Sequence, residues 1–177
     1  MKNFPVEIDG KEYWISRAVA VVGFVFYLDD GELFILAGKR GKGSSDFQGY
    51  WNVPCGYLDF DETTKQACSR ELEEETNLHV NPDAWILFGI EDDPKANRQN
   101  ITFRYYTFSN ESYKDQTIYA KGAEKDEVED VQWIPVSKIN KYQWAFNHKR
   151  RISEIILDKL SNWINPEIRL QLTEDLN

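Results

Sequence analysis

The sequence predicts a mixed α/β fold, in which a β-sheet packs against amphipathic helices. Three observations lead to this prediction. Apolar runs rich in β-branched and aromatic residues recur along the chain, a helical pattern separates them near residues 61–77, and an amphipathic pattern closes the chain from residue 148 onward. With 177 residues, 41% of them hydrophobic, the chain has the length of one compact domain, which we place over residues 1–177.

The first strands are expected in two hairpins. Segment 4–16 predicts a β-hairpin, because an Asp-Gly pair separates alternating apolar positions. Segment 17–41 contains two more β-rich runs joined at a second Asp-Gly pair, and the first run is almost wholly apolar, as in a central strand. Pro135 predicts that the last strand lies near an edge or ends there. The later strands are expected at residues 84–92, 101–110 and 131–136.

Two helical regions are expected. The acidic segment predicts a helix that starts at Asp61 or Thr63 and ends near Asn77, because Asn tolerates the left-handed conformation common at helix ends. At the C-terminus, helices are expected over about residues 147–176, with a new helix opening at Pro166. The apolar positions of the first of these helices repeat at helical spacing, so we expect it to cover one face of the sheet.

Composition restricts the class of protein. A formal net charge of −9 disfavours broad binding to nucleic acid, and the basic run at residues 148–151 is more typical of a solvated helix start. We expect no membrane span, because the longest apolar run is well short of about 20 residues. The N-terminus lacks a secretory pattern, so a cytoplasmic protein is expected. Cys55 and Cys68 are too few for a disulfide framework or a zinc set and are expected to pack in the interior.

The acidic helix predicts a metal site. Glu71, Glu74 and Glu75 fall within a sector of about 100° on a helical wheel. Acids near a helix C-terminus are electrostatically unfavourable, so a cation from outside the helix is expected to compensate them. Clustered carboxylates suit Mg²⁺ or Mn²⁺. The alternative is an acid-rich, solvated helix face that binds no metal.

The same residues match a known family pattern. Gly56, Glu62, Arg70-Glu71 and Glu74-Glu75 stand at the spacing of the Nudix box, G-x5-E-x7-R-E-U-x-E-E-x-G-U, where U is aliphatic. The box departs only at its second glycine, which is Asn77 here. The order of strands also resembles a Nudix domain over roughly residues 15–162. This resemblance implies an α/β/α sandwich around a mixed β-sheet, and hydrolysis of a nucleoside diphosphate linked to another group X.

The resemblance also implies roles for individual residues. Glu71, Glu74 and Glu75 match the metal-binding carboxylates, and the backbone carbonyl of Cys55 is a fourth candidate ligand. Arg70, together with Glu62, matches a pair that braces the loop against the helix and orients these carboxylates.

A general base is expected on the later acidic loop, with Glu127 as the first candidate and Glu129 as the second. The alternative is a solvated acidic loop without a catalytic role.

Residues for substrate binding are less well determined by the sequence. Arg40, Arg98 and Arg104 are candidates for contacts with substrate phosphates, and each is equally compatible with an ordinary surface charge. Three aromatic residues are candidates either for stacking on a base or for the core, and the core is the commoner role. These are Phe47, Trp51 and Tyr105.

The sequence therefore predicts an Mg²⁺-dependent (or Mn²⁺-dependent) Nudix hydrolase. Its substrate is expected to be a small nucleotide: a nucleotide sugar, a dinucleotide or a nucleoside triphosphate. The alternative is a Nudix-like module that senses a nucleotide without turnover and regulates a partner. Members of that kind usually have eroded box acids and an added DNA-binding domain, neither of which we identify in this sequence. The resemblance further implies that a homodimer is a common assembly.

Overall fold

A computed structural model of the chain describes residues 2–109, 113, 115–120 and 126–176. Its strands are β1 (Phe4–Ile8), β2 (Lys11–Ile15), β3 (Ala18–Asp29), β4 (Glu32–Arg40), β5 (Trp51–Asn52), β6 (Cys55–Tyr57), β7 (Ile86–Glu91), β8 (Asn100–Ser109) and β9 (Val128–Pro135). Its α-helices are α1 (Thr64–Thr76), α2 (His148–Lys159) and α3 (Pro166–Glu174). Short 3-10 turns are η1 (Pro82–Ala84), η2 (Val136–Lys141) and η3 (Ser161–Trp163).

A seven-stranded mixed sheet forms the centre of the molecule. Its main path runs β5-β4-β3-β8-β7, while β6 pairs with β3 and β9 pairs with β4. The β3–β8 pairing is parallel and the others are antiparallel. As predicted, β3 is a buried central strand, and Pro135 is the last residue of β9. Among the strands that the structure describes, β9 pairs with β4 alone. Asn110, the last residue of the strand predicted at 101–110, lies outside the described residues.

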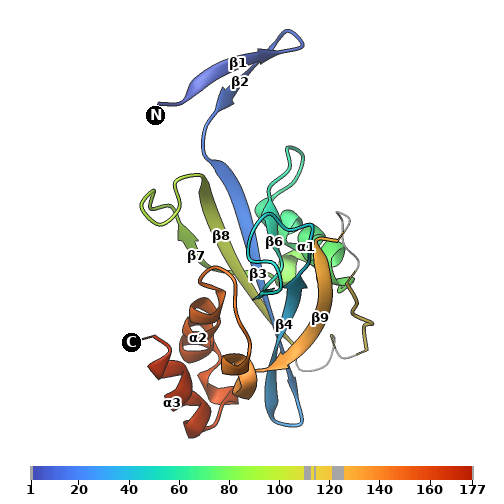
Figure 1. The fold of residues 1–177 in the computed structure, drawn as a ribbon, viewed down its shortest axis with the longest axis vertical. Helices are drawn as coiled ribbons and strands as arrows, with labels where there is room; N and C mark the ends of the chain where they lie inside the picture. Colours follow the sequence, from blue (N-terminus) through green and yellow to red (C-terminus); the bar gives the residue numbers. More distant parts are fainter. Residues whose placement is uncertain (1, 110–112, 114, 121–125, 177) are drawn as a thin grey trace.

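Helices cover both faces of this sheet (Figure 1). Alternate side chains of β3 enter two separate cores, because successive residues of a strand point to opposite faces. Val21 and Val25 pack with Leu72 of α1 on one face. Phe24 packs with Ile152 of α2 on the other, where α3 also contributes. The predicted α/β/α arrangement is therefore confirmed.

The predicted hairpins are present, each with an Asp-Gly turn. Asp9-Gly10 joins β1 to β2 and Asp30-Gly31 joins β3 to β4, and all four residues have positive φ. Glycine adopts this conformation without strain, which is why the pair favours tight two-residue turns. The β1–β2 hairpin forms its own two-stranded sheet and projects beyond the start of β3 (Figure 1).

None of the helices that the structure describes combines the length and apolar composition that crossing a membrane requires. Both cysteines are free thiols that pack against the cores, as expected from their number.

Candidate active site and metal centre

Helix α1 is fixed at both ends by local hydrogen bonds. Thr63 is the N-cap: its hydroxyl accepts from the backbone N–H of Gln66, and the Gln66 side chain accepts from the backbone N–H of Thr63. This capping box satisfies two N–H groups that the helix cannot pair internally. At the other end Asn77 adopts the left-handed conformation, with φ of 61°. The helix therefore begins and ends as the sequence predicts, and its acidic residues fall in the last two turns.

Arg70 cross-links the loop before α1 to the helix. Its guanidinium donates two hydrogen bonds to Glu62, at 2.7 and 3.1 Å, and one to the Tyr57 carbonyl at 2.9 Å. It also donates to Glu71 at 2.8 Å and to Glu74 at 3.1 Å. These contacts hold the pKa of Glu62 below its usual value. The predicted Glu62–Arg70 pair is confirmed, and Arg70 contacts two of the three predicted metal-binding acids.

Glu75 is the most deeply buried of these acids, with 6% of its surface exposed. Its Oε1 accepts a hydrogen bond from the backbone N–H of Cys55 at 3.2 Å, but Oε2 is buried and has no partner among the described residues. Burial raises the pKa of Glu75 well above its usual value, and the charges of Glu71 and Glu127 raise it further. A buried carboxylate oxygen without a partner is costly, so this position favours a bound cation.

Glu71 lies against β6 at a point where any side chain larger than that of glycine would displace its carboxylate. A Cβ atom added to Gly56 would lie 2.1 Å from the Glu71 carboxylate. The glycine of the box thus lets the strand backbone approach the acid closely. Burial raises the pKa of Glu71, while its hydrogen bond to Arg70 acts in the opposite direction.

The donor set suits a hard divalent cation. Glu75 provides an unpartnered carboxylate oxygen, and Glu71 and Glu74 add carboxylate oxygens on the same helix. Oxygen ligands of this kind suit Mg²⁺ and Mn²⁺. Within the described ranges, no group of three or more His, Cys, Asp or Glu side chains is arranged to enclose an ion, and both Glu71 and Glu74 contact Arg70 instead.

The two candidate bases, Glu127 and Glu129, differ in their surroundings, and a catalytic role for either stays a prediction. The backbone carbonyl of Glu127 accepts hydrogen bonds from the Gly41 N–H at 2.7 Å and the Ser44 hydroxyl at 3.0 Å, which fix the loop. Its charge raises the pKa of both Glu71 and Glu75. Glu129 instead forms an ion pair with Lys39 at 3.1 Å.

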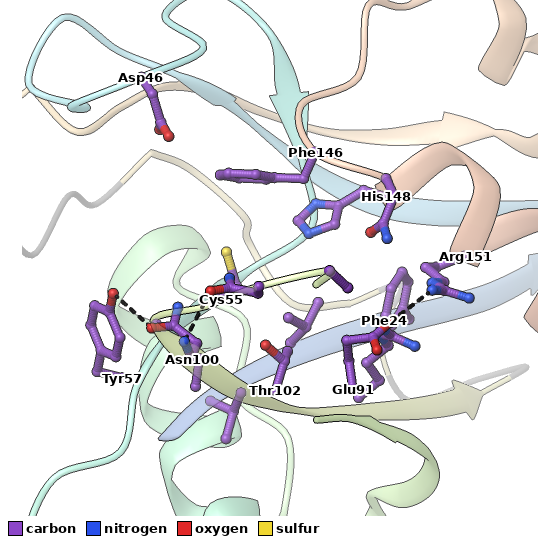
Figure 2. Close-up of a pocket in the computed structure, with 18 of the residues that line it drawn as sticks. Phe24, Asp46, Cys55, Tyr57, Glu91, Asn100, Thr102, Phe146, His148 and Arg151 are labelled. Carbon is purple, nitrogen blue, oxygen red and sulfur yellow. Dashed lines mark hydrogen bonds and ion pairs between the residues drawn. The ribbon is translucent and has the colours of Figure 1, made fainter. Parts of the chain in front are cut away.

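A cavity of about 560 Å³ adjoins the acids, on the face of the sheet that α2 covers. Strand β6 connects the two regions: Cys55 and Gly56 line the cavity and also contact Glu75 and Glu71. In Figure 2, Phe146 and His148 lie across the cavity from Thr102, with Cys55 between them. The charged and aromatic lining residues are Phe24, Arg40, Asp46, Tyr57, Glu91, Arg104, Phe146, His148 and Arg151.

Two of the three cations predicted to bind substrate line the cavity, and the third does not. Arg40 and Arg104 line the cavity, whereas Arg98 is exposed in the β7–β8 loop and lies outside the lining. Arg40 hydrogen-bonds Asp46 at 2.7 Å and lies 5.2 Å from the centre of the Phe146 ring.

Of the three aromatic candidates, two belong to the cores. These are Trp51 and Tyr105, while Phe47 is partly exposed and contacts Phe146 at 5.0 Å between ring centres.

Sequence reasoning missed several polar residues of the cavity, among them two from α2 and one from β7. His148 and Arg151 belong to the basic run that was expected to be solvated, and Glu91 ends β7. Glu91 accepts from Arg104 at 2.8 Å and from Arg151 at 3.3 Å, so it joins three elements. The one available signal was the helical spacing of α2: His148 and Arg151 lie on the same side as the buried Ile152 and Ile155.

A family model described as "NUDIX domain" matches residues 16–155, which is most of the chain. The chain belongs to the NUDIX domain family. This match confirms the resemblance inferred from the Nudix box, while the extension of a single domain over residues 1–177 stays a prediction. The match includes α1 and the strands that contribute to the cavity lining, which are β3, β4, β6, β7 and β8, and it ends within α2.

Solved structures of the family share this fold. The NUDIX domain of Shewanella oneidensis NrtR, complexed with ADP ribose, is 24% identical with a TM-score of 0.64, covering 79% of this chain and 86% of that one. A bifunctional NMN adenylyltransferase/ADP ribose pyrophosphatase from Francisella tularensis, complexed with AMP and a Mn ion, is 24% identical with a TM-score of 0.65. There the match covers 84% of this chain and 42% of that one.

Curated relatives are considerably longer than the matched region. The m7GpppN-mRNA hydrolase of Saccharomyces cerevisiae is 23% identical over 126 residues, which cover 71% of this chain but only 12% of the yeast protein. The m7GpppN-mRNA hydrolase NUDT17 of Xenopus laevis is 28% identical over 88 residues, 50% of this chain and 27% of that protein.

Proposed function

We propose that the chain is a Nudix hydrolase that depends on Mg²⁺ or Mn²⁺ and cleaves a pyrophosphate bond in a nucleoside diphosphate linked to a group X. The observation that carries this proposal is Glu75: a carboxylate buried beside Cys55, with one oxygen that has no partner among the described residues. A structural acid gains nothing from such a position, whereas a cation ligand requires a free oxygen.

In this proposal Glu71, Glu74, Glu75 and the Cys55 carbonyl hold the cation. When bound, the cation supplies charge neutralisation at the phosphate oxygens and lowers the pKa of water. Arg70 acts as a positioning residue, because it contacts both Glu71 and Glu74.

The remaining steps fall to side chains around the acids. Glu127 accepts the proton of the attacking water. Arg40 and Arg104 bind substrate phosphates, for which guanidinium groups are well suited. A role for Arg98 stays a prediction from the sequence.

We expect a nucleotide sugar as the substrate, and ADP-ribose heads the panel to be tested. The support is likeness of fold with proteins whose structures contain ADP ribose or are described as an ADP ribose pyrophosphatase. The panel should also contain a dinucleotide, a nucleoside triphosphate and a cap dinucleotide, the last because of the similarity to m7GpppN-mRNA hydrolases.

The test is hydrolysis of this panel with Mg²⁺, with Mn²⁺ and with a chelator, scored as release of mononucleotide or phosphate. We expect turnover of at least one nucleotide that chelation abolishes and added metal restores. Tight binding of a nucleotide without turnover under any of these conditions would instead support the sensor alternative. Failure of Mg²⁺ and Mn²⁺ to bind in calorimetric titration would leave the acidic face as a solvated surface.

A further inference from the structure

His148 is the first residue of α2, and 5% of its surface is exposed. Its ring lies between Phe24 and Phe146, at 6.2 and 5.2 Å between ring centres, and it lines the cavity (Figure 2). A buried polar ring at this position needs a reason, because a hydrophobic side chain would pack there without losing hydration.

One hydrogen bond determines which ring nitrogen carries the proton. The backbone N–H of Val53 donates to Nδ1 of His148 at 3.2 Å, so Nδ1 is the acceptor and bears no hydrogen. In a neutral imidazole the proton must then sit on Nε2, which becomes a donor. Burial lowers the pKa of His148 to about 3, and the charges of Arg40 and Arg104 add to this effect. The ring therefore stays neutral at physiological pH.

The donor at Nε2 differs from the charged donors of the cavity. Among the described residues, no hydrogen-bond partner is found for Nε2. The guanidinium groups, in contrast, are already paired with carboxylates: Arg40 with Asp46, and both Arg104 and Arg151 with Glu91. A ligand must compete with a carboxylate to bind these cations, whereas it can accept from His148 directly.

We propose that His148 is a binding residue of this cavity, where its Nε2–H donates a hydrogen bond to an oxygen of the group X linked to the nucleoside diphosphate. This inference rests on the proposed function for the class of ligand. The backbone of Val53 acts as the positioning group, since it fixes the tautomer from the side opposite to the ligand. The accepting oxygen is either a hydroxyl or a phosphate oxygen of X, and the ligands of the test distinguish these sources.

The test compares two substitutions, each of which places a polar side-chain atom near the position of one of the two ring nitrogens. In His148→Asn the side-chain oxygen can still accept from Val53, but the donor into the cavity is lost. In His148→Gln the amide nitrogen reaches the position of Nε2 and restores the donor. Dissociation constants for ADP-ribose and ATP are measured by calorimetry in the presence of a chelator, so that no hydrolysis occurs. Thermal unfolding of each variant is recorded as the control for folding.

We expect His148→Asn to bind ADP-ribose about 3- to 10-fold more weakly, the value of one neutral hydrogen bond, and His148→Gln to recover most of this loss. A loss with ADP-ribose alone assigns the acceptor to a hydroxyl, and an equal loss with ATP assigns it to a phosphate oxygen. Equal affinities of the wild type and the Asn variant for both ligands would overturn the proposal. So would failure of the wild-type protein to bind either ligand.

A second measurement does not depend on any variant. Long-range ¹H–¹⁵N NMR of the histidine-labelled protein reports which ring nitrogen is protonated. We expect Nε2–H near neutral pH, with a shift of this proton when ADP-ribose is added. A proton on Nδ1 would overturn the inference. Binding of ADP-ribose with this shift, but without hydrolysis in Mg²⁺, would retain the inference and reject the proposed activity.

Discussion

The acidic end of α1 and the cavity beside α2 both gather charged side chains, yet only the cavity balances its charges internally. In the cavity Arg40 pairs with Asp46 at 2.7 Å, and Arg104 pairs with Glu91 at 2.8 Å. In the acidic region one cation, Arg70, is shared by several carboxylates, and Glu75 has no cation within salt-bridge distance among the described residues.

This difference implies that the acidic end of α1 and the cavity bind different kinds of ligand. A buried excess of negative charge destabilises the folded chain unless a cation from solution compensates it, which is why we proposed a metal site at α1. Balanced charges keep the cavity close to neutral, and selection there depends on shape and on individual donors such as His148. The two regions share β6, which allows one ligand to contact both.

The largest effect is expected from removing the unbalanced charge. Glu75→Gln retains the acceptor for the Cys55 N–H but no longer provides a carboxylate. We expect the rate of hydrolysis to fall about 10²- to 10³-fold. Mutation of a residue that only hydrogen-bonds a metal ligand already lowers metal affinity or activity by about 10- to 100-fold. The melting temperature of the metal-free protein should not fall, because a costly buried charge has been removed. Steady-state kinetics and calorimetric Mn²⁺ titration measure both consequences.

The matched control is Glu73→Gln, on the solvated side of the same helix, where Glu73 pairs with His79. It changes the net charge equally and should leave activity and Mn²⁺ affinity unchanged. Equal activity of the Glu75→Gln variant and the wild type would remove the basis for a metal at α1.

A smaller effect is expected from moving an acid without neutralising it. In Gly56→Ala the new Cβ would lie 2.1 Å from the Glu71 carboxylate, which must shift. We expect activity to fall about 10- to 100-fold. The cost in stability should be about 1 kcal/mol, because the displaced atoms are the end of a flexible side chain.

Gly89→Ala provides the comparison for this change, because a Cβ atom at that position meets nothing within 4 Å. This variant should retain full activity. A Gly56→Ala enzyme that is as active as Gly89→Ala would show that the position of Glu71 is unimportant for hydrolysis.

The acidic region was more predictable from the sequence than the cavity, for a physical reason. Local signals within one segment predict both termini of the helix, at Thr63 and Asn77. They also predict the pairing of Glu62 with Arg70. The burial of Glu75 depends on how β6 packs against α1, which no local pattern specifies.

The cavity combines residues from distant segments, and each of them is unremarkable in its own context. His148 stands in a basic run that is typical of a solvated helix start, and only the orientation of α2 against the sheet buries it. The same holds for Glu91, whose two arginine partners lie 13 and 60 residues further along the chain. Tertiary packing therefore determines which residues line the cavity.

The neutral histidine predicts a specific dependence of stability on pH. The pKa of His148 is about 3 in the folded protein and 6.5 in an exposed histidine, so the unfolded chain binds more protons between these values. The contribution of His148 to the free energy of unfolding is fully present above pH 6.5 and is lost as the pH falls. Between pH 6.5 and about 5 the wild type should lose about 1.6 kcal/mol through this group, at up to about 1.4 kcal/mol per pH unit.

His148→Asn removes this group and leaves the acids in place, so its stability should fall less steeply over the same range. Denaturant unfolding at several pH values measures both slopes. Parallel slopes for the two proteins would mean that His148 is not held neutral in the folded state.

The smallest effect is expected at the end of α1 that carries no acids. Thr63→Ala removes the acceptor for the Gln66 N–H and should lower the free energy of unfolding by about 1 kcal/mol. The Mn²⁺ affinity should stay unchanged, because the cap lies two turns from Glu71 and the Arg70 contacts remain. A loss of Mn²⁺ affinity in this variant would mean that the acids depend on the stability of the whole helix. The charge imbalance would then no longer be a property of the last two turns alone.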